Sequence, residues 1–179
     1  GVRSGRAVPR HWAVAQRPVD VFDAKADVFA VLDALGAPVE KLTVDPAGAP
    51  EWYHPGRSAA VRLGPKATLA VFGEIHPKVL RRLGAKPPVV AFELFFAQLP
   101  PVKGQQGKAR PPLKLSALQP VERDFAFVVD ASVPAEAVVR AARGAEKALT
   151  RDVRVFDVFA GGMLKERKKS LAVTVLLQP

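Results

Sequence analysis

The sequence predicts an α+β protein made of two compact units, each built around a mostly antiparallel sheet. Short runs rich in apolar and β-branched residues, typical of strands, outnumber the segments with helical periodicity. Hydrophobic residues make up 49% and charged residues 25% of the 179 residues, a balance typical of folded domains. A stretch rich in proline and glycine, Pro100–Pro112, interrupts this pattern. We therefore predict a first unit at residues 1–100, a linker at 101–112 and a second unit at 113–179.

The first unit contains one segment with the period of an amphipathic helix. Its apolar residues are Val28, Val31, Leu32 and Leu35. We predict a helix over Ala24–Leu35, with Asp23 as its N-cap and Gly36 just past its end. Asp20 and Asp23 are also a potential catalytic carboxylate pair. Capping is the favoured interpretation, because Asp23 precedes a helix and Asp20 lies in an extended stretch.

A second, shorter helix is predicted over Pro77–Leu83. His76 precedes it, proline suits its first turn, and Gly84 follows it. Four apolar runs are predicted as strands: Lys41–Val44, Ser58–Leu63, Ala67–Gly73 and Val89–Phe95. Between these elements, HPG at His54–Gly56 is predicted to form a turn, with Arg57 paired to a carboxylate.

The second unit begins with an apolar run, Phe125–Val129, which we expect to form a strand buried on both faces. A helix follows, capped by Ser132 or Val133, with Pro134 in its first turn and an apolar stripe that reaches Leu149. Two more predicted strands, Val153–Phe159 and Leu171–Leu177, complete the order βαββ. They are joined by a Gly161-Gly162 turn and a basic stretch, Lys165–Lys169.

The βαββ order is the first two-thirds of the ferredoxin-like βαββαβ plan. We therefore expect the second unit to be a ferredoxin-like domain that lacks its last helix and strand. Because the chain begins with Gly1 and not with Met, we also expect it to be a piece of a longer protein.

The charge of the chain favours a polyanionic partner. It carries 27 basic and 17 acidic residues, a net charge of +10, and the second unit is the more basic per residue. The candidate contacts to the phosphates of such a partner are Arg123, Lys165, Arg167, Lys168 and Lys169. The alternative interpretation of these residues is an ordinary solvated turn.

Several kinds of chemistry have no support in the sequence. There is no cysteine, and His11, His54 and His76 have no metal-ligand spacing, so no metal site is predicted. The P-loop and the GxGxxG fingerprint are absent, and Ser58 and Ser170 lack the context of a nucleophile. No apolar run is long enough to span a bilayer. We expect a cytoplasmic protein with no catalytic residues and no cofactor of its own.

Seven strings of residues, in order along the chain, resemble the β subunit of bacterial phenylalanyl-tRNA synthetase, and specifically its C-terminal part. They are VDVFDAKADV (19–28), HPGRSA (54–59), FGEIHPKVL (72–80), PVERDFAFVVD (120–130), VPAEAV (133–138), VRVFDVFAG (153–161) and KKSLAV (168–173). Relatives usually carry a glycine in the turn before KKS, where this chain has Arg167.

The resemblance implies a specific function, which the composition and the residue spacing alone do not predict. It implies that the first unit is part of an inactive class II synthetase core that packs against the catalytic α subunit of a heterotetramer. It implies that the second unit is a ferredoxin-fold domain that binds the anticodon stem-loop of phenylalanine tRNA. The whole enzyme would use ATP and magnesium, with neither a membrane nor DNA as partner. The alternatives are a protein-interaction scaffold without RNA contact and an independent enzyme on a ferredoxin-like fold.

Overall fold

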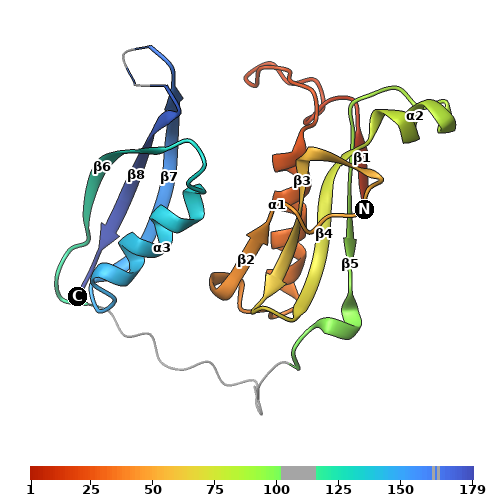
Figure 1. The fold of residues 1–179 in the computed structure, drawn as a ribbon. Helices are drawn as coiled ribbons and strands as arrows, with labels where there is room; N and C mark the ends of the chain where they lie inside the picture. Colours follow the sequence, from red (N-terminus) through yellow and green to blue (C-terminus); the bar gives the residue numbers. More distant parts are fainter. Residues whose placement is uncertain (102–115, 163, 165) are drawn as a thin grey trace. The chain divides into compact units, whose positions relative to one another are not determined.

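The computed structural model describes residues 1–101, 116–162, 164 and 166–179 (Figure 1). The chain divides into two compact units, residues 1–108 and 109–179. Most of the predicted linker, 101–112, lies outside the described residues, as does Lys165.

The first unit is a five-stranded antiparallel sheet in the order β1-β5-β4-β3-β2. Its strands are β1 (Val2–Ser4), β2 (Leu42–Asp45), β3 (Tyr53–Leu63), β4 (Ala67–Ile75) and β5 (Val89–Leu94). Helix α1 (Val21–Ala34) lies along one face of this sheet (Figure 1), and α2 (Pro77–Leu83) follows β4. Two short 3₁₀ turns, Val39–Lys41 and Phe96–Gln98, flank β2 and β5. The four predicted strands are confirmed, and β1 was not predicted.

The main core lies between α1 and the sheet. Val28 and Leu32 of α1 are fully buried and belong to one cluster with Val61, Leu69 and Val90 of the sheet. A smaller cluster comprises Tyr53, Ala60, Val71 and Ala91. The Tyr53 hydroxyl donates to Oε1 of Glu93 over 3.1 Å. Burial, followed by the charge and the hydrogen bond of Glu93, raises the pKa of Tyr53.

Helix α1 begins earlier than predicted, and its N-cap is Asp20, not Asp23. The Asp20 carboxylate accepts hydrogen bonds from the backbone N–H groups of Phe22 (2.8 Å) and Asp23 (3.2 Å). Asp23 completes the capping box by accepting from the Asp20 N–H over 2.9 Å. Either acidic residue fits the local pattern of a cap, so the pattern does not determine where the helix starts. Helix α2 has the predicted bounds, with His76 as N-cap and Gly84 left-handed at φ 67°.

The second unit is a three-stranded antiparallel sheet in the order β6-β8-β7. Its strands are β6 (Val121–Asp130), β7 (Thr150–Ala160) and β8 (Lys168–Leu177), and α3 (Ala135–Ala145) connects β6 to β7. Strands β6 and β7 both run antiparallel to the central β8 and so are parallel to each other. This is the split βαβ arrangement of the ferredoxin-like plan, which confirms the predicted fold of this unit.

Helix α3 covers one face of this sheet. Val138, Val139 and Ala142 of α3 pack against buried Val173 and Val175 of β8. The helix is shorter than predicted. It ends at Ala145, so Leu149 lies beyond it, and its N-cap is Pro134, not Ser132 or Val133.

The prediction that β6 is buried on both faces is wrong. Phe125 is 46%, Phe127 41% and Val128 60% exposed. Within the described residues β6 pairs with β8 alone and lies at an edge of the sheet. Burial of a strand depends on its neighbours in the sheet, and the sequence of β6 does not contain that information.

Candidate nucleic-acid interface

One face of the second sheet carries α3, and the other face has no helix on it among the described residues. Side chains alternate between the two faces of a strand, so the buried Val173 and Val175 point toward α3 and their neighbours point away. Cross-strand partners share a face, which allows the residues of the open face to be read from the register. They are Glu122, Asp124, Ala126, Val128, Asp152, Arg154, Asp157, Phe159, Lys168, Ser170, Ala172, Thr174 and Leu176, together with Asp130.

One row of this open face has two exposed apolar side chains on either side of a serine. Ser170 of β8 lies opposite Val128 of β6 on one side and opposite Phe159 of β7 on the other. Val128 is 60% and Phe159 51% exposed. An exposed aromatic ring beside a hydroxyl provides both stacking surface and a hydrogen-bonding group. Sequence reasoning did not single out this row, because its three residues come from three strands and only the register brings them together.

The basic turn, defined as Arg167, Lys168 and Lys169, adjoins that row. The Lys168 ammonium pairs with Oδ1 of Asp130 at 2.7 Å, and the Lys169 ammonium donates to the Ala131 carbonyl over 2.9 Å. Both lysines belong to β8 and not to the preceding turn as predicted. Arg167 is left-handed, at φ 63°, and its carbonyl accepts from the Ala131 N–H over 2.8 Å. Local hydrogen bonds thus hold Lys168 and Lys169 beside the end of β6. Lys168 lies on the open face, whereas Lys169 is paired with Val129 and lies on the face that carries α3.

Arg123 lies apart from the basic turn. It is paired with Val175, whereas Lys168 is paired with Asp130, so seven residues of strand separate the two positions. That corresponds to about 23 Å along the strand. Arg123 also faces the side of the sheet that carries α3, and it donates to the carbonyl of Glu122. The four candidate residues that the structure describes therefore do not form one surface.

The far half of the open face is mostly acidic. Arg154 lies between Asp152, at 2.9 Å, and Glu122, at 4.0 Å. Asp124 accepts a hydrogen bond from the Thr174 hydroxyl over 2.6 Å. Phosphate groups are repelled by such carboxylates. The electrostatics of the face thus favour an anion only at the end that carries the basic turn.

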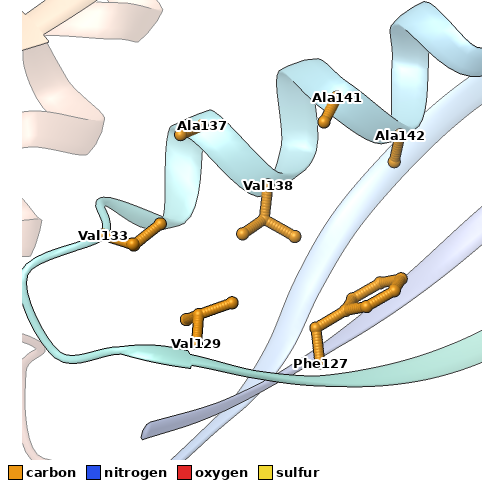
Figure 2. Close-up of a pocket in the computed structure, with 7 residues that line it drawn as sticks. All are labelled: Phe127, Val129, Val133, Ala137, Val138, Ala141 and Ala142. Atoms are coloured by element: carbon orange, nitrogen blue, oxygen red, sulfur yellow. The ribbon is translucent and has the colours of Figure 1, made fainter. Parts of the chain in front are cut away.

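A second surface of this unit is an apolar groove between α3 and β6. It has a volume of about 450 Å³, and Figure 2 shows Phe127 and Val129 of β6 directed toward Val138 and the alanines of α3. The residues that line it are Phe127, Val129, Val133, Ala137, Val138, Ala141 and Ala142. All of the described residues that line the groove are apolar, so the groove provides a surface for packing.

The described residues contain no cluster of three or more potential metal ligands. His54 and His76 stack with ring centroids 6.3 Å apart, while His11 stacks on Trp12. The predicted pairing of Arg57 is confirmed, since its guanidinium contacts Glu74 at 2.7 Å. The HPG segment is part of β3, at a shift in register between Tyr53 and Ser58, and not a separate turn. Among the helices that the structure describes, none is long and apolar enough to cross a membrane.

The two units match two known family models. Residues 1–96 match the CLM domain of the phenylalanyl tRNA synthetase beta chain. Residues 116–179 match the ferredoxin-fold anticodon binding domain. The second unit therefore belongs by fold and by sequence to a class of domains named for tRNA recognition.

Curated relatives are similar in sequence to this chain over its whole length. It is 54% identical over 179 residues to the phenylalanine–tRNA ligase beta subunit of Rhodospirillum rubrum. It is 55% identical over 179 residues to that of Paramagnetospirillum magneticum and 51% identical over 183 residues to that of Mesorhizobium japonicum. These matches cover 100% of this chain and 22%, 22% and 23% of the relatives, so the chain spans about a fifth of their length. The chain belongs to the phenylalanyl-tRNA synthetase β subunit family.

Proposed function

We propose that this chain serves in a phenylalanine–tRNA ligase, where its second unit binds the anticodon stem-loop of phenylalanine tRNA. The observation that carries the proposal is the open sheet face of a unit that matches the anticodon-binding family. Single-stranded RNA loops are recognised through unstacked bases that lie against exposed sheet side chains, with phosphates held by nearby cations.

The row Val128–Ser170–Phe159 would engage a loop base. Phe159 provides a ring for stacking, and the Ser170 hydroxyl can donate to or accept from a base edge. The neighbouring basic turn would hold the phosphates on either side of that base, and Lys165 is proposed to act with it. The carboxylates of the far half would keep the RNA backbone toward the turn. Arg123 is the weakest of the candidate residues, because it lies seven strand residues away from Lys168 and faces the other side of the sheet.

The first unit is proposed to be a non-catalytic part of a class II synthetase-like core that contacts the catalytic α subunit. The sequence lacks ATP-binding motifs, so ATP and magnesium would be bound elsewhere in the complete enzyme. The proposed setting is the cytoplasm, within an α/β heterotetramer. The alternative is a scaffold without RNA contact, and the acidic far half of the open face is the observation that favours it.

The test compares tRNA affinity for the complete β subunit assembled with its α partner, from low to moderate salt. The variant carries Lys165, Arg167, Lys168 and Lys169 changed to Ala. We expect weaker binding and a salt slope of log K reduced by roughly 0.7 to 0.9 for each phosphate that the variant no longer binds.

The matched control removes four exposed cations of the first unit, with Lys78→Ala, Arg81→Ala and Arg82→Ala in α2 and Lys86→Ala just after it. The control is expected to retain the affinity and salt slope of the parent. Unchanged tRNA affinity in the variant with intact assembly would favour the scaffold alternative.

A further inference from the structure

A long loop near the N-terminus projects from the first unit with all of its residues, 8–18, exposed. It extends past the N-terminal end of α1 (Figure 1). Its base is fixed by two hydrogen bonds, from the Ala7 N–H to the Arg17 carbonyl (3.0 Å) and from the Val19 N–H to the Gly5 carbonyl (2.9 Å). A loop with an anchored base presents its tip in a defined place, which reduces the entropy lost when a ligand binds.

The loop and the residues that flank it carry only positive side-chain charges. Residues 1–19 include four arginines and no acidic residue. Two of the arginines pair with α1: Arg3 with Asp27 at 3.6 Å, and Arg17 with Asp23 at 2.7 Å. Within the part of the chain that the structure describes, Arg6 and Arg10 have no carboxylate within 4.0 Å. These two guanidinium groups are available to an anionic ligand.

The tip of the loop carries a stacked pair of aromatic rings. His11 and Trp12 lie with ring centroids 5.7 Å apart and an interplanar angle of 26°. The Ala13 N–H donates to Nδ1 of His11 over 3.1 Å, which orients the imidazole. Trp12 is 94% exposed, so this tryptophan does not contribute to the core of the first unit.

We propose that this loop is an RNA-binding site in the first unit, where an unpaired base stacks on Trp12 and flanking phosphates bind Arg6 and Arg10. Aromatic platforms combined with cations are the usual elements of single-strand binding. An acidic protein surface would also satisfy the arginines. RNA is favoured because the exposed surface at the tip is a flat stacked ring pair, while its aliphatic neighbours Val8 and Val14 are only 37% and 47% exposed.

The two tryptophans of the chain allow a direct test, because Trp12 becomes the single tryptophan when Trp52→Phe is introduced. The 179-residue chain would be titrated with unlabelled 12-nucleotide oligouridylate and oligoadenylate, and tryptophan emission recorded. The background includes Arg167→Ala, Lys168→Ala and Lys169→Ala, so that failure of anticodon binding by the second unit cannot be mistaken for failure of this site. We expect saturable quenching of Trp12.

Variants of the loop separate stacking from charge. Affinity in these variants is measured by competition with fluorescein-labelled oligonucleotide. Trp12→Ala is expected to weaken binding about 5- to 150-fold, the range for removal of one base stack, with the salt slope unchanged. Arg6→Ala with Arg10→Ala should reduce the salt slope by roughly 0.7 for each phosphate contact on a single strand. The charge-matched control is Lys78→Ala with Arg81→Ala, which should bind like the parent.

Two results would overturn the proposal. One is the absence of Trp12 quenching by either oligonucleotide at low salt. The other is unchanged oligonucleotide affinity in Trp12→Ala, accompanied by a loss of self-association or of binding to polyglutamate, which would identify the loop as a protein-docking surface.

Discussion

At the scale of the residue, Arg167 is in a backbone conformation that suits glycine. Its φ of 63° is the left-handed region, where a side chain costs of order 1 kcal/mol or more. Its carbonyl bonds to the Ala131 N–H, so the surrounding contacts hold it there. We expect Arg167→Gly to stabilise the second unit by about 1 kcal/mol. The free energy gained by relieving the backbone strain exceeds the free energy lost because glycine makes the unfolded chain more flexible. The measurement is urea unfolding followed by amide exchange of β8.

Glu166→Gly is the matched control for this prediction. Glu166 is the adjacent residue in the same turn and is not in the left-handed region. Glu166→Gly also raises the conformational entropy of the unfolded chain, but it relieves no backbone strain in the folded state. The free energy of unfolding should therefore fall or remain unchanged. Equal effects of the two substitutions would show that the φ of Arg167 carries no energetic cost.

Asp23 makes the stability of the first unit depend on pH in the acidic range. The hydrogen bonds from Arg17, at 2.7 Å, lower the pKa of Asp23, and burial opposes them. A lowered pKa in the folded state stabilises the fold above the unfolded-state value of about 3.9, and this stabilisation is lost as the pH falls through the folded value. Arg17→Ala should therefore reduce stability at pH 7 and have progressively less effect below about pH 4.

Urea midpoints from pH 7 to pH 3, read by tryptophan fluorescence of the first unit, test this dependence. Arg10→Ala, in the same loop, removes an equal charge that has no carboxylate partner among the described residues. If the difference between Arg17→Ala and the parent stays constant over the whole pH range, the ion pair does not contribute through Asp23.

At the scale of the element, the capping box of α1 is a measurable part of the stability of the helix. Asp20 satisfies two backbone N–H groups at the start of the helix, which otherwise have no partner within it. Asp20→Ala should cost about 1 kcal/mol in the free energy of unfolding. Asp33→Ala, on the exposed surface of the same helix, is the control and should change stability by less than about 0.5 kcal/mol.

The elements show how far sequence reasoning extends. Helix α2 was predicted to the residue because its signals are local, with a proline at the start and Gly84 at the end. The start of α1 was misplaced by three residues, since Asp20 and Asp23 both take part in one cap. The exposure of β6 and the row Val128–Ser170–Phe159 depend on which strands are neighbours, and that information is spread over the whole unit.

The candidate site was predicted in part for the same reason. Lys168 and Lys169 are close in sequence and so remain close in the fold. Arg123 was grouped with them by charge alone, and strand register separates it from them. Charge identifies the kind of partner, whereas topology decides which cations act together.

At the scale of the whole molecule, we expect the 179-residue chain to have no amino-acid activation of its own. The expectation rests on the sequence, which contains neither a P-loop nor a GxGxxG fingerprint. Phenylalanine-dependent ATP–pyrophosphate exchange by the purified chain should equal the background without protein. The complete α/β enzyme is the positive control, and phenylalanyl-adenylate formed by the chain alone would refute this expectation.

The edge of β6 has a practical consequence for handling the chain in solution. Within the described residues its outer backbone N–H and C=O groups have no partner strand, and Phe125 and Phe127 beside them are partly exposed. Such an edge is a template for intermolecular strand addition. The net charge of +10 keeps molecules apart at low ionic strength. Added salt shortens the screening length to about 8 Å at 0.15 M, so solubility should fall as salt is raised, with precipitates rich in intermolecular β-structure.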